Sequence, residues 1–146
     1  MINFFAKDVN FSIQKKAIYK KWLNEVILIY GFKAGEINII FCSDSYILEI
    51  NSEFLNHNYY TDIITFDYSD DNILSGELYI SIDTVLLNSK KYKQTFENEL
   101  NRVIVHGVLH LCGLNDHTKS EKIEMRHAED NALIFLTKFF NPDSNE

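Results

Sequence analysis

The chain contains few of the residues that interrupt folded structure. Its 146 residues include one proline, Pro142, and five glycines, which leaves little material for flexible linkers. No run approaches the ~18 uninterrupted apolar residues of a membrane-spanning helix. The opening "MINFFAKDVN" lacks the basic and apolar regions of a secretory signal. We therefore expect a single domain over residues 1–146 that is cytoplasmic and has no membrane partner.

Cysteine is also scarce. Cys42 and Cys112 are the two present, which is too few for a disulfide framework. Both lie in apolar stretches, "IIFCS" and "LHLCG". We expect two buried, reduced thiols with no role in the chemistry.

Basic residues are outnumbered by acidic ones. The chain has 14 Lys plus Arg against 21 Asp plus Glu, a net charge of −7. This balance argues against a protein that coats nucleic acid through its overall charge. Lysines still cluster locally, and such clusters either form solvated faces, the commoner case, or contact a polyanion. They are Lys15, Lys16, Lys20 and Lys21 in one segment and Lys90, Lys91 and Lys93 in another.

Strand and helix patterns alternate along most of the chain. Stretches rich in β-branched or alternating apolar residues predict strands at 2–6, 36–42, 61–68 and 76–82. Apolar residues at helical spacing, with capping residues at the ends, predict helices at 12–30, 43–55, 83–89, 96–112 and 118–140. We predict an α+β fold in which one mixed sheet of about four strands packs with about five helices.

The stretch "HGVLHLCGLNDH" predicts a metal site on a helix and its following loop. His106 and His110 are at i and i+4, so both imidazoles lie on one helix face at the spacing that chelates zinc. Gly113 ends the helix and lets the loop bring a third ligand, Asp116 or His117. Three protein ligands leave a position open for water, as in catalytic zinc sites, whereas structural sites usually use four. We predict one Zn²⁺ per chain.

The residue after the first histidine restricts the chemistry. Gly107 stands where zinc peptidases of the H-E-x-x-H pattern carry the glutamate that activates water. Without that base, hydrolysis of a peptide is disfavoured. A phosphodiester is the more plausible substrate, because its leaving group is better and a cation can stabilise its charged oxygens. The expected nucleophile is water held by the metal, and the sequence identifies no general acid or base.

These residues resemble a known family. "HGVLHLCGLNDH" resembles the H-G-x-L-H-L-x-G-x-D-H signature of the bacterial YbeY proteins, zinc-dependent endoribonucleases of rRNA maturation and ribosome quality control. "INSEFLNHNYYTDIITF" (50–66) is similar to the family's L-N-x-x-Y-R-x-K-D-x-P-T-D-V-L-S-F. "GELYIS" (76–81) is similar to its G-[DE]-[IV]-x-[IL]-S strand. The likeness runs from about Glu36 to Ala132.

Two departures from the family pattern affect the expected site. The family places its third histidine ten residues after the first, where this chain has Asp116, and His117 comes one residue later. Loop length favours Asp116 and residue type favours His117, and we favour Asp116. Leu55 occupies the position of a family arginine that is thought to handle phosphate. Arg102 and Lys91 are candidates to replace it, by residue type only.

Carboxylates elsewhere could orient the metal ligands. A metal-bound histidine commonly donates its second ring N–H to a carboxylate. Asp62 and Glu77, which lie in the two blocks similar to the family, are candidates for this role. Asp62 could instead be an ordinary turn former at the start of a strand.

Two further histidines and a tyrosine pair have weaker claims. His127 is expected to be a solvated helix residue. His57 falls on a basic position of the family pattern and could meet RNA, although a plain loop residue is the commoner case. Tyr59 and Tyr60 could stack on bases, although packing under the sheet is commoner for such pairs. The sequence does not identify the substrate-binding residues.

The resemblance implies a zinc-dependent, single-strand-specific endoribonuclease in 16S rRNA processing and ribosome quality control, with rRNA and the ribosome as partners and no DNA. One alternative is a ribosome-associated RNA- or protein-binding module with a structural zinc and no catalysis, which a fourth protein ligand would support. The other is a metal hydrolase of a different substrate, such as a peptide or a small phosphoester, which a narrow, deep metal pocket would favour.

Overall fold

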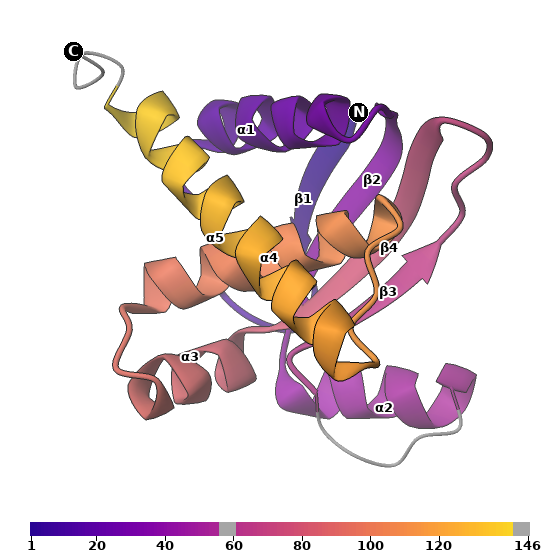
Figure 1. Cartoon of the computed structure of the whole chain (residues 1–146). Helices are drawn as coiled ribbons and strands as arrows, with labels where there is room; N and C mark the ends of the chain where they lie inside the picture. The colour runs from indigo at the N-terminus through magenta and orange to yellow at the C-terminus, as the bar shows by residue number, and fades with distance from the viewer. Residues whose placement is uncertain (56–60, 142–146) are drawn as a thin grey trace.

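In the computed structural model, which describes residues 1–55 and 61–141, the chain forms one four-stranded sheet and five helices (Figure 1). The strands are β1 (Ile2–Ala6), β2 (Lys33–Cys42), β3 (Ile63–Asp67) and β4 (Ile73–Ser81). The helices are α1 (Lys16–Ile29), α2 (Asp44–Leu55), α3 (Ile82–Lys91), α4 (Phe96–Leu111) and α5 (Lys119–Phe140).

The sheet is mixed, with the strand order β1-β2-β4-β3. Strands β1 and β2 are parallel, as are β2 and β4, whereas β3 is antiparallel to β4 and forms an edge. The predicted α+β fold with a mixed sheet is therefore confirmed. The number of strands and helices in the described part of the chain also matches the prediction.

The starts of three elements, α1, β2 and β4, were predicted wrongly by three or more residues. Strand β4 begins at Ile73, where it pairs with the start of β2, rather than at residue 76. Helix α1 begins at Lys16 rather than at residue 12, because Lys15 adopts a left-handed conformation with φ of 56° that an α-helix cannot continue. Strand β2 begins at Lys33 rather than at residue 36. Its first residues pair with the start of β4 (Lys33 with Ile73, for example), and this pairing extends the strand beyond its β-branched part.

The two faces of the sheet are covered differently. The side chains of Ile39, Phe41 and Leu78 point to one face, where they join the main core with residues of α1, α4 and α5. Figure 1 shows these three helices crossing that inner face. Because side chains alternate along a strand, neighbouring residues point to the outer face. There Cys42 and Ile64 pack with helix α2 in a smaller cluster.

Both cysteines are buried, as predicted. Cys42 and Cys112 are free and are 0% and 7% exposed. Burial raises the pKa of each thiol to about 12, so both stay protonated and uncharged near neutral pH. Among the described residues, no helix combines the length and the apolar character that crossing a membrane requires.

Helix α4 approaches the sheet closely at Gly107. A Cβ atom added there would come within 2.5 Å of Leu78 Cδ2 and 2.7 Å of Ile63 Cδ1. Leu78 is fully buried, so it has little freedom to move aside. Packing therefore requires glycine at position 107, because the sheet leaves no room there for a side chain.

This contact predicts that Gly107→Ala destabilises the fold. Overpacking of a filled core costs about 1–3 kcal/mol, whereas alanine gains about 1 kcal/mol over glycine in a helix. We expect a net loss of up to ~2 kcal/mol in the free energy of unfolding, measured by urea denaturation. Asn98→Ala, at an exposed position of the same helix, is the control and should change stability little. A Gly107→Ala protein as stable as the parent would contradict the packing explanation.

Candidate metal centre

Helix α4 carries the predicted histidines in a well-defined frame. Thr95 caps its start, where its hydroxyl accepts a hydrogen bond from the Asn98 amide at 3.0 Å. At the other end Gly113 adopts a φ of +100°, a conformation that favours glycine. The Gly113 amide donates to the His110 carbonyl at 2.9 Å. The chain then turns back along the helix, and this turn brings the following loop toward the histidines.

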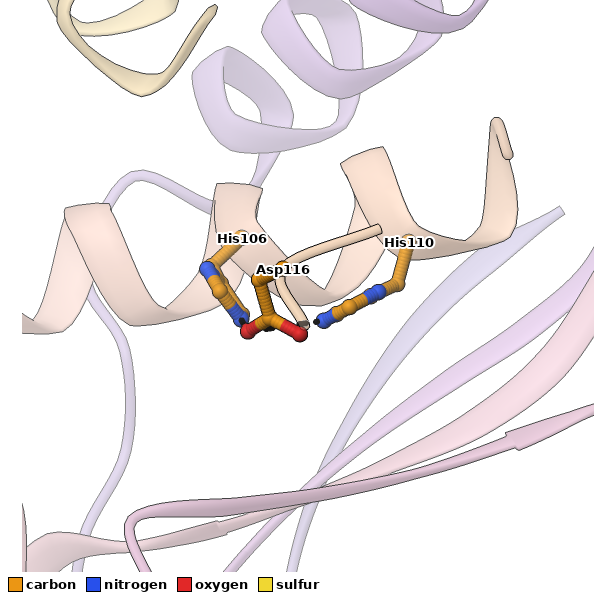
Figure 2. Close-up of side chains that lie close together, drawn as sticks. All are labelled: His106, His110 and Asp116. Carbon is orange, nitrogen blue, oxygen red and sulfur yellow. Dashed lines mark ion pairs between the residues drawn. The ribbon is translucent and has the colours of Figure 1, made fainter. Parts of the chain in front are cut away.

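The loop places Asp116 between the two imidazoles. Asp116 Oδ2 lies 3.3 Å from His106 Nε2 and 3.5 Å from His110 Nε2. Figure 2 shows both histidines leaving the same side of the helix, with the carboxylate between their ring nitrogens. One ligand atom from each residue lies within 4.8 Å of the other two. His106, His110 and Asp116 thus form a group that could hold a metal ion.

The spacing of these atoms fits a tetrahedral ion. Zinc binds imidazole nitrogen and carboxylate oxygen at about 2.0–2.2 Å, so two ligand atoms of a tetrahedral site lie about 3.3–3.6 Å apart. The measured separations of 3.3 and 3.5 Å fall in this range. Nitrogen and oxygen donors without sulfur are also a donor set that zinc accepts. The residues therefore fit the predicted cofactor.

His117 stands outside this group in the described structure. Its backbone amide donates to Glu121 Oε1 at 3.2 Å. Next to it, Thr118 and Glu121 form the predicted capping box at the start of α5. His117 is thus fixed as the residue before the helix cap, while Asp116 faces the histidines. The geometry favours Asp116 over His117 as the third ligand.

A carboxylate from another helix orients the first histidine. Glu129 of α5 places its Oε2 atom 2.6 Å from His106 Nδ1. The carboxylate accepts a hydrogen bond from Nδ1 and holds a proton there, so in the neutral ring Nε2, which faces Asp116, is the nitrogen left to bind a metal. This is the arrangement that metal-binding histidines commonly use. Glu129 is buried, at 5% exposure.

Arg102 in turn holds Glu129. Its Nη1 lies 2.8 Å from Glu129 Oε1, and its Nη2 lies 2.7 Å from Asp130 Oδ1. Burial alone would raise the pKa of Glu129, but the hydrogen bonds from His106 and Arg102 outweigh it and hold that pKa below its usual value. Glu129 is therefore ionised near neutral pH and can act as the acceptor for His106.

Glu129 replaces the carboxylates that the sequence suggested for this role. Glu77 cannot reach His106, because it pairs with Phe66 on the outer face of the sheet, away from α4. Its Oε1 instead accepts a hydrogen bond from the Tyr68 hydroxyl at 3.2 Å. A sequence signal for Glu129 existed, since it lies on the buried face of α5 with Met125 and Ala132, where a carboxylate needs a partner.

Asp62 does belong to the site, in a different position. It lines a hollow of about 460 Å³ between strand β3 and the metal group. Burial raises the pKa of the Asp62 carboxyl, and the charge of His106 opposes this only in part. The hollow is lined by Thr61, Asp62, Ile63, Thr65, Asp67, His106, His110, Leu111, Asn115, Asp116 and His117.

Three other candidates, Lys91, Leu55 and His127, are not among the residues that line this hollow. The ammonium of Lys91 lies over the Tyr92 ring, 5.5 Å from its centroid. Leu55 ends helix α2 and is 40% exposed. His127 is exposed on α5, as predicted. His57, Tyr59 and Tyr60 fall outside the described residues, so their expected contacts stay predictions.

Comparison with known proteins gives a consistent result over nearly the whole chain. A family model described as Endoribonuclease YbeY matches residues 1–137, a longer stretch than the sequence motifs alone covered. A protein named Endoribonuclease YbeY from Porphyromonas gingivalis is 49% identical over 135 residues, 92% of this chain and 89% of its own length. One from Phocaeicola vulgatus is 47% identical over 137 residues, 94% of this chain and 99% of its own.

A solved structure shares the fold. The solution structure of TM1509 from Thermotoga maritima superposes with a TM-score of 0.62 at 23% sequence identity. The match covers 100% of this chain and 99% of that chain. At this identity the likeness concerns the fold alone.

The position of the third ligand predicts how metal content responds to mutation. Asp116→Ala should lose zinc at least about tenfold more readily to a competing chelator, because one of three ligands is removed. His117→Ala should retain zinc like the parent protein. Elemental analysis after dialysis against a graded chelator series measures both. The reverse pattern would assign the third ligand to His117.

The contact between Glu129 and His106 predicts a second effect on metal affinity. Glu129→Gln keeps the side-chain shape but weakens the acceptor for His106 Nδ1, and we expect zinc affinity to fall about 10- to 100-fold. Asp130→Asn, which neutralises the other partner of Arg102, is the matched control and should change zinc affinity little. Competition with a fluorescent zinc chelator measures both affinities. Equal affinities in the two variants would show that Glu129 does not support the metal site.

Proposed function

The chain belongs to the Endoribonuclease YbeY family, and from that premise we propose that it is a zinc-dependent endoribonuclease that cuts single-stranded RNA. The observation that carries this proposal is the group of His106, His110 and Asp116 on the wall of an accessible hollow. The side chains of these residues are 22%, 25% and 34% exposed. A substrate in solution can therefore reach the ligand atoms.

The residues around the hollow have separable roles in this mechanism. When bound, a zinc ion supplies positive charge for a phosphodiester and lowers the pKa of water. His106 and His110 would hold the ion through Nε2, and Asp116 would contribute one negative oxygen. Glu129 keeps the proton of His106 on Nδ1. Asp62 lines the same hollow, where its carboxyl can exchange a hydrogen bond with water or with a substrate hydroxyl.

The geometry disfavours a peptidase. The H-E-x-x-H mechanism needs a glutamate beside the first histidine, and Gly107 at that position packs against Leu78 and Ile63. A glutamate there would be driven into apolar side chains. Peptide hydrolysis would therefore need a general base from elsewhere, whereas a phosphodiester is stabilised directly by the cation.

The geometry also disfavours a purely structural zinc site. Structural zinc is normally enclosed by four protein ligands. Within the described part of the chain the group contains three, and it borders a hollow of about 460 Å³. An open coordination position beside a hollow of this size suits an extended substrate better than a closed structural role.

The biological setting is proposed from the family. Relatives named Endoribonuclease YbeY from three genera match 90% or more of this chain. We assign the chain to processing of ribosomal RNA and to ribosome quality control in the cytoplasm, with the ribosome or a ribosomal subunit as its partner.

The proposal predicts metal-dependent cleavage of RNA. Zinc-loaded protein should cut a single-stranded RNA, dialysis against a chelator should abolish the cleavage, and added zinc should restore it. Single-stranded DNA of the same sequence and duplex RNA should stay intact. Gel analysis of end-labelled substrates measures all five reactions. Asp116→Ala, purified in parallel, controls for contaminating nuclease, and a zinc-loaded parent protein that leaves the RNA intact would refute the proposed activity.

A further inference from the structure

A second hollow, of about 320 Å³, adjoins the metal centre. Asp62, His106 and Asp116 line both this hollow and the larger one. The two hollows therefore meet at the candidate metal ligands. Whatever binds in the second hollow lies directly beside the place where a substrate would be cut.

Two arginines bring positive charge to the second hollow, and their situations differ. Arg102 already bridges Glu129 and Asp130 through its two terminal nitrogens. Arg126 lies on the first half of α5 and is exposed. It forms no ion pair within residues 1–55 and 61–141. Arg126 can therefore take an anionic ligand without breaking a salt bridge.

Arg126 lines the second hollow, and its charge acts on another residue that lines it. It opposes the rise in the pKa of Glu99 that burial causes, and Glu99 lines the same hollow. The other carboxylates that line this hollow are Asp62, Asp116 and Glu129. They repel an anion from its interior, so a phosphate is expected at the margin, where Arg126 stands.

Lysines extend this positive charge along α5. Lys119, Lys122 and Arg126 line a shallow hollow of about 400 Å³ together with Ile123, His127 and Asp130. The spacings of three and four residues place the three basic residues on one side of the helix. They cover about 10 Å of its length. We call Lys119, Lys122 and Arg126 the basic stripe. The stripe reaches the metal centre at Arg126, because this residue lines both the shallow hollow on α5 and the second hollow beside the metal ligands.

We propose that Arg126 binds a backbone phosphate next to the one that is cut, and that Lys119 and Lys122 guide the RNA strand along α5. This inference rests on the proposed nuclease function and names how its substrate is held. It also accounts for Leu55, which stands where the family pattern has arginine and lines neither hollow at the metal centre. A guanidinium from α5 supplies the bidentate phosphate contact instead.

The basic stripe reconciles RNA binding with the acidic chain. The net charge of −7 acts at long range and is screened beyond about 8 Å at physiological ionic strength. A phosphate in contact with Arg126 is closer than this to the guanidinium. Local attraction along α5 therefore decides binding.

The test measures binding and cleavage separately, on the full zinc-loaded protein. Binding uses a short single-stranded RNA with phosphorothioate linkages, which keep the backbone charge and slow cleavage. Arg126→Gln should bind about tenfold more weakly, and the slope of log affinity against log salt should fall by about 0.7, the value for one lost phosphate contact to a single strand. On unmodified RNA the KM should rise by a similar factor. Zinc content should not change.

Two further variants separate contact from general charge. Arg126→Lys should recover part of the affinity, because it keeps the charge and loses the planar fork. Lys138→Gln, an exposed position at the far end of the same helix, is the control and should bind like the parent. Arg126→Gln should lower RNA affinity by the same factor in a Glu99→Gln background as in the parent protein. If Arg126 served only to neutralise Glu99, its effect would vanish in that background.

The outcomes distinguish this inference from the proposed function. If Arg126→Gln binds RNA with the parent's affinity and salt slope, the assignment of Arg126 is wrong, whether or not the protein cuts RNA. If the parent binds RNA through Arg126 and cuts none, the nuclease function fails and the phosphate contact stands.

Discussion

Helix α4 can lie directly on strand β4 because position 107 carries no side chain, and the candidate site depends on that contact. With Gly107 against Leu78, the preceding residue, His106, and His110 one turn later are held beside the edge strand β3. The same contact leaves the opposite side of α4 free to pack with α3 and α5. A larger side chain at position 107 would push α4 off the sheet and move the histidines away from the hollow that β3 lines.

The second level of organisation is electrostatic. Arg102 and His106 on α4 and Glu129 on α5 form one chain of contacts, which runs from Arg102 through Glu129 to His106. It joins α4 to α5 by a partly buried ion pair and by a hydrogen bond that fixes the ring of a candidate ligand. Because such a contact chain is costly to leave half-satisfied, the packing of α5 on α4 and the readiness of the metal site are coupled. A mutation that weakens the packing of α5 on α4 would therefore also disturb the metal ligands.

Much of this could be predicted from local sequence signals, and the failures have definite causes. The i, i+4 histidines, the terminating glycine and the capping box are short-range patterns, and each lies where the sequence placed it. The start of β2 was missed because its first residues are held by pairing with β4 rather than by their own propensity. Glu129 was missed because it lies 23 positions from its partner His106 in the chain. Its position on the apolar face of a predicted helix could have been recognised from the sequence.

Glu77 shows a different kind of failure. Its neighbour Leu78 faces the core. Because side chains alternate along a strand, Glu77 must face the opposite side of the sheet, and this alone would have excluded Glu77 from the site. For the third ligand the sequence favoured Asp116 on loop length but left His117 open on residue type, because the outcome depends on how far the turn after Gly113 carries the chain.

The segment between α4 and α5 is short and held at both ends. Hydrogen bonds from Gly113 and Leu114 tie its start to the last turn of α4, and the pair of Thr118 and Glu121 ties its end to α5. Its conformational entropy is therefore lost when the protein folds, not when an ion arrives. Uptake of metal then requires ligand atoms to shed water and little else. Such a site is expected to fill without reorganising the fold and to keep its shape between turnovers.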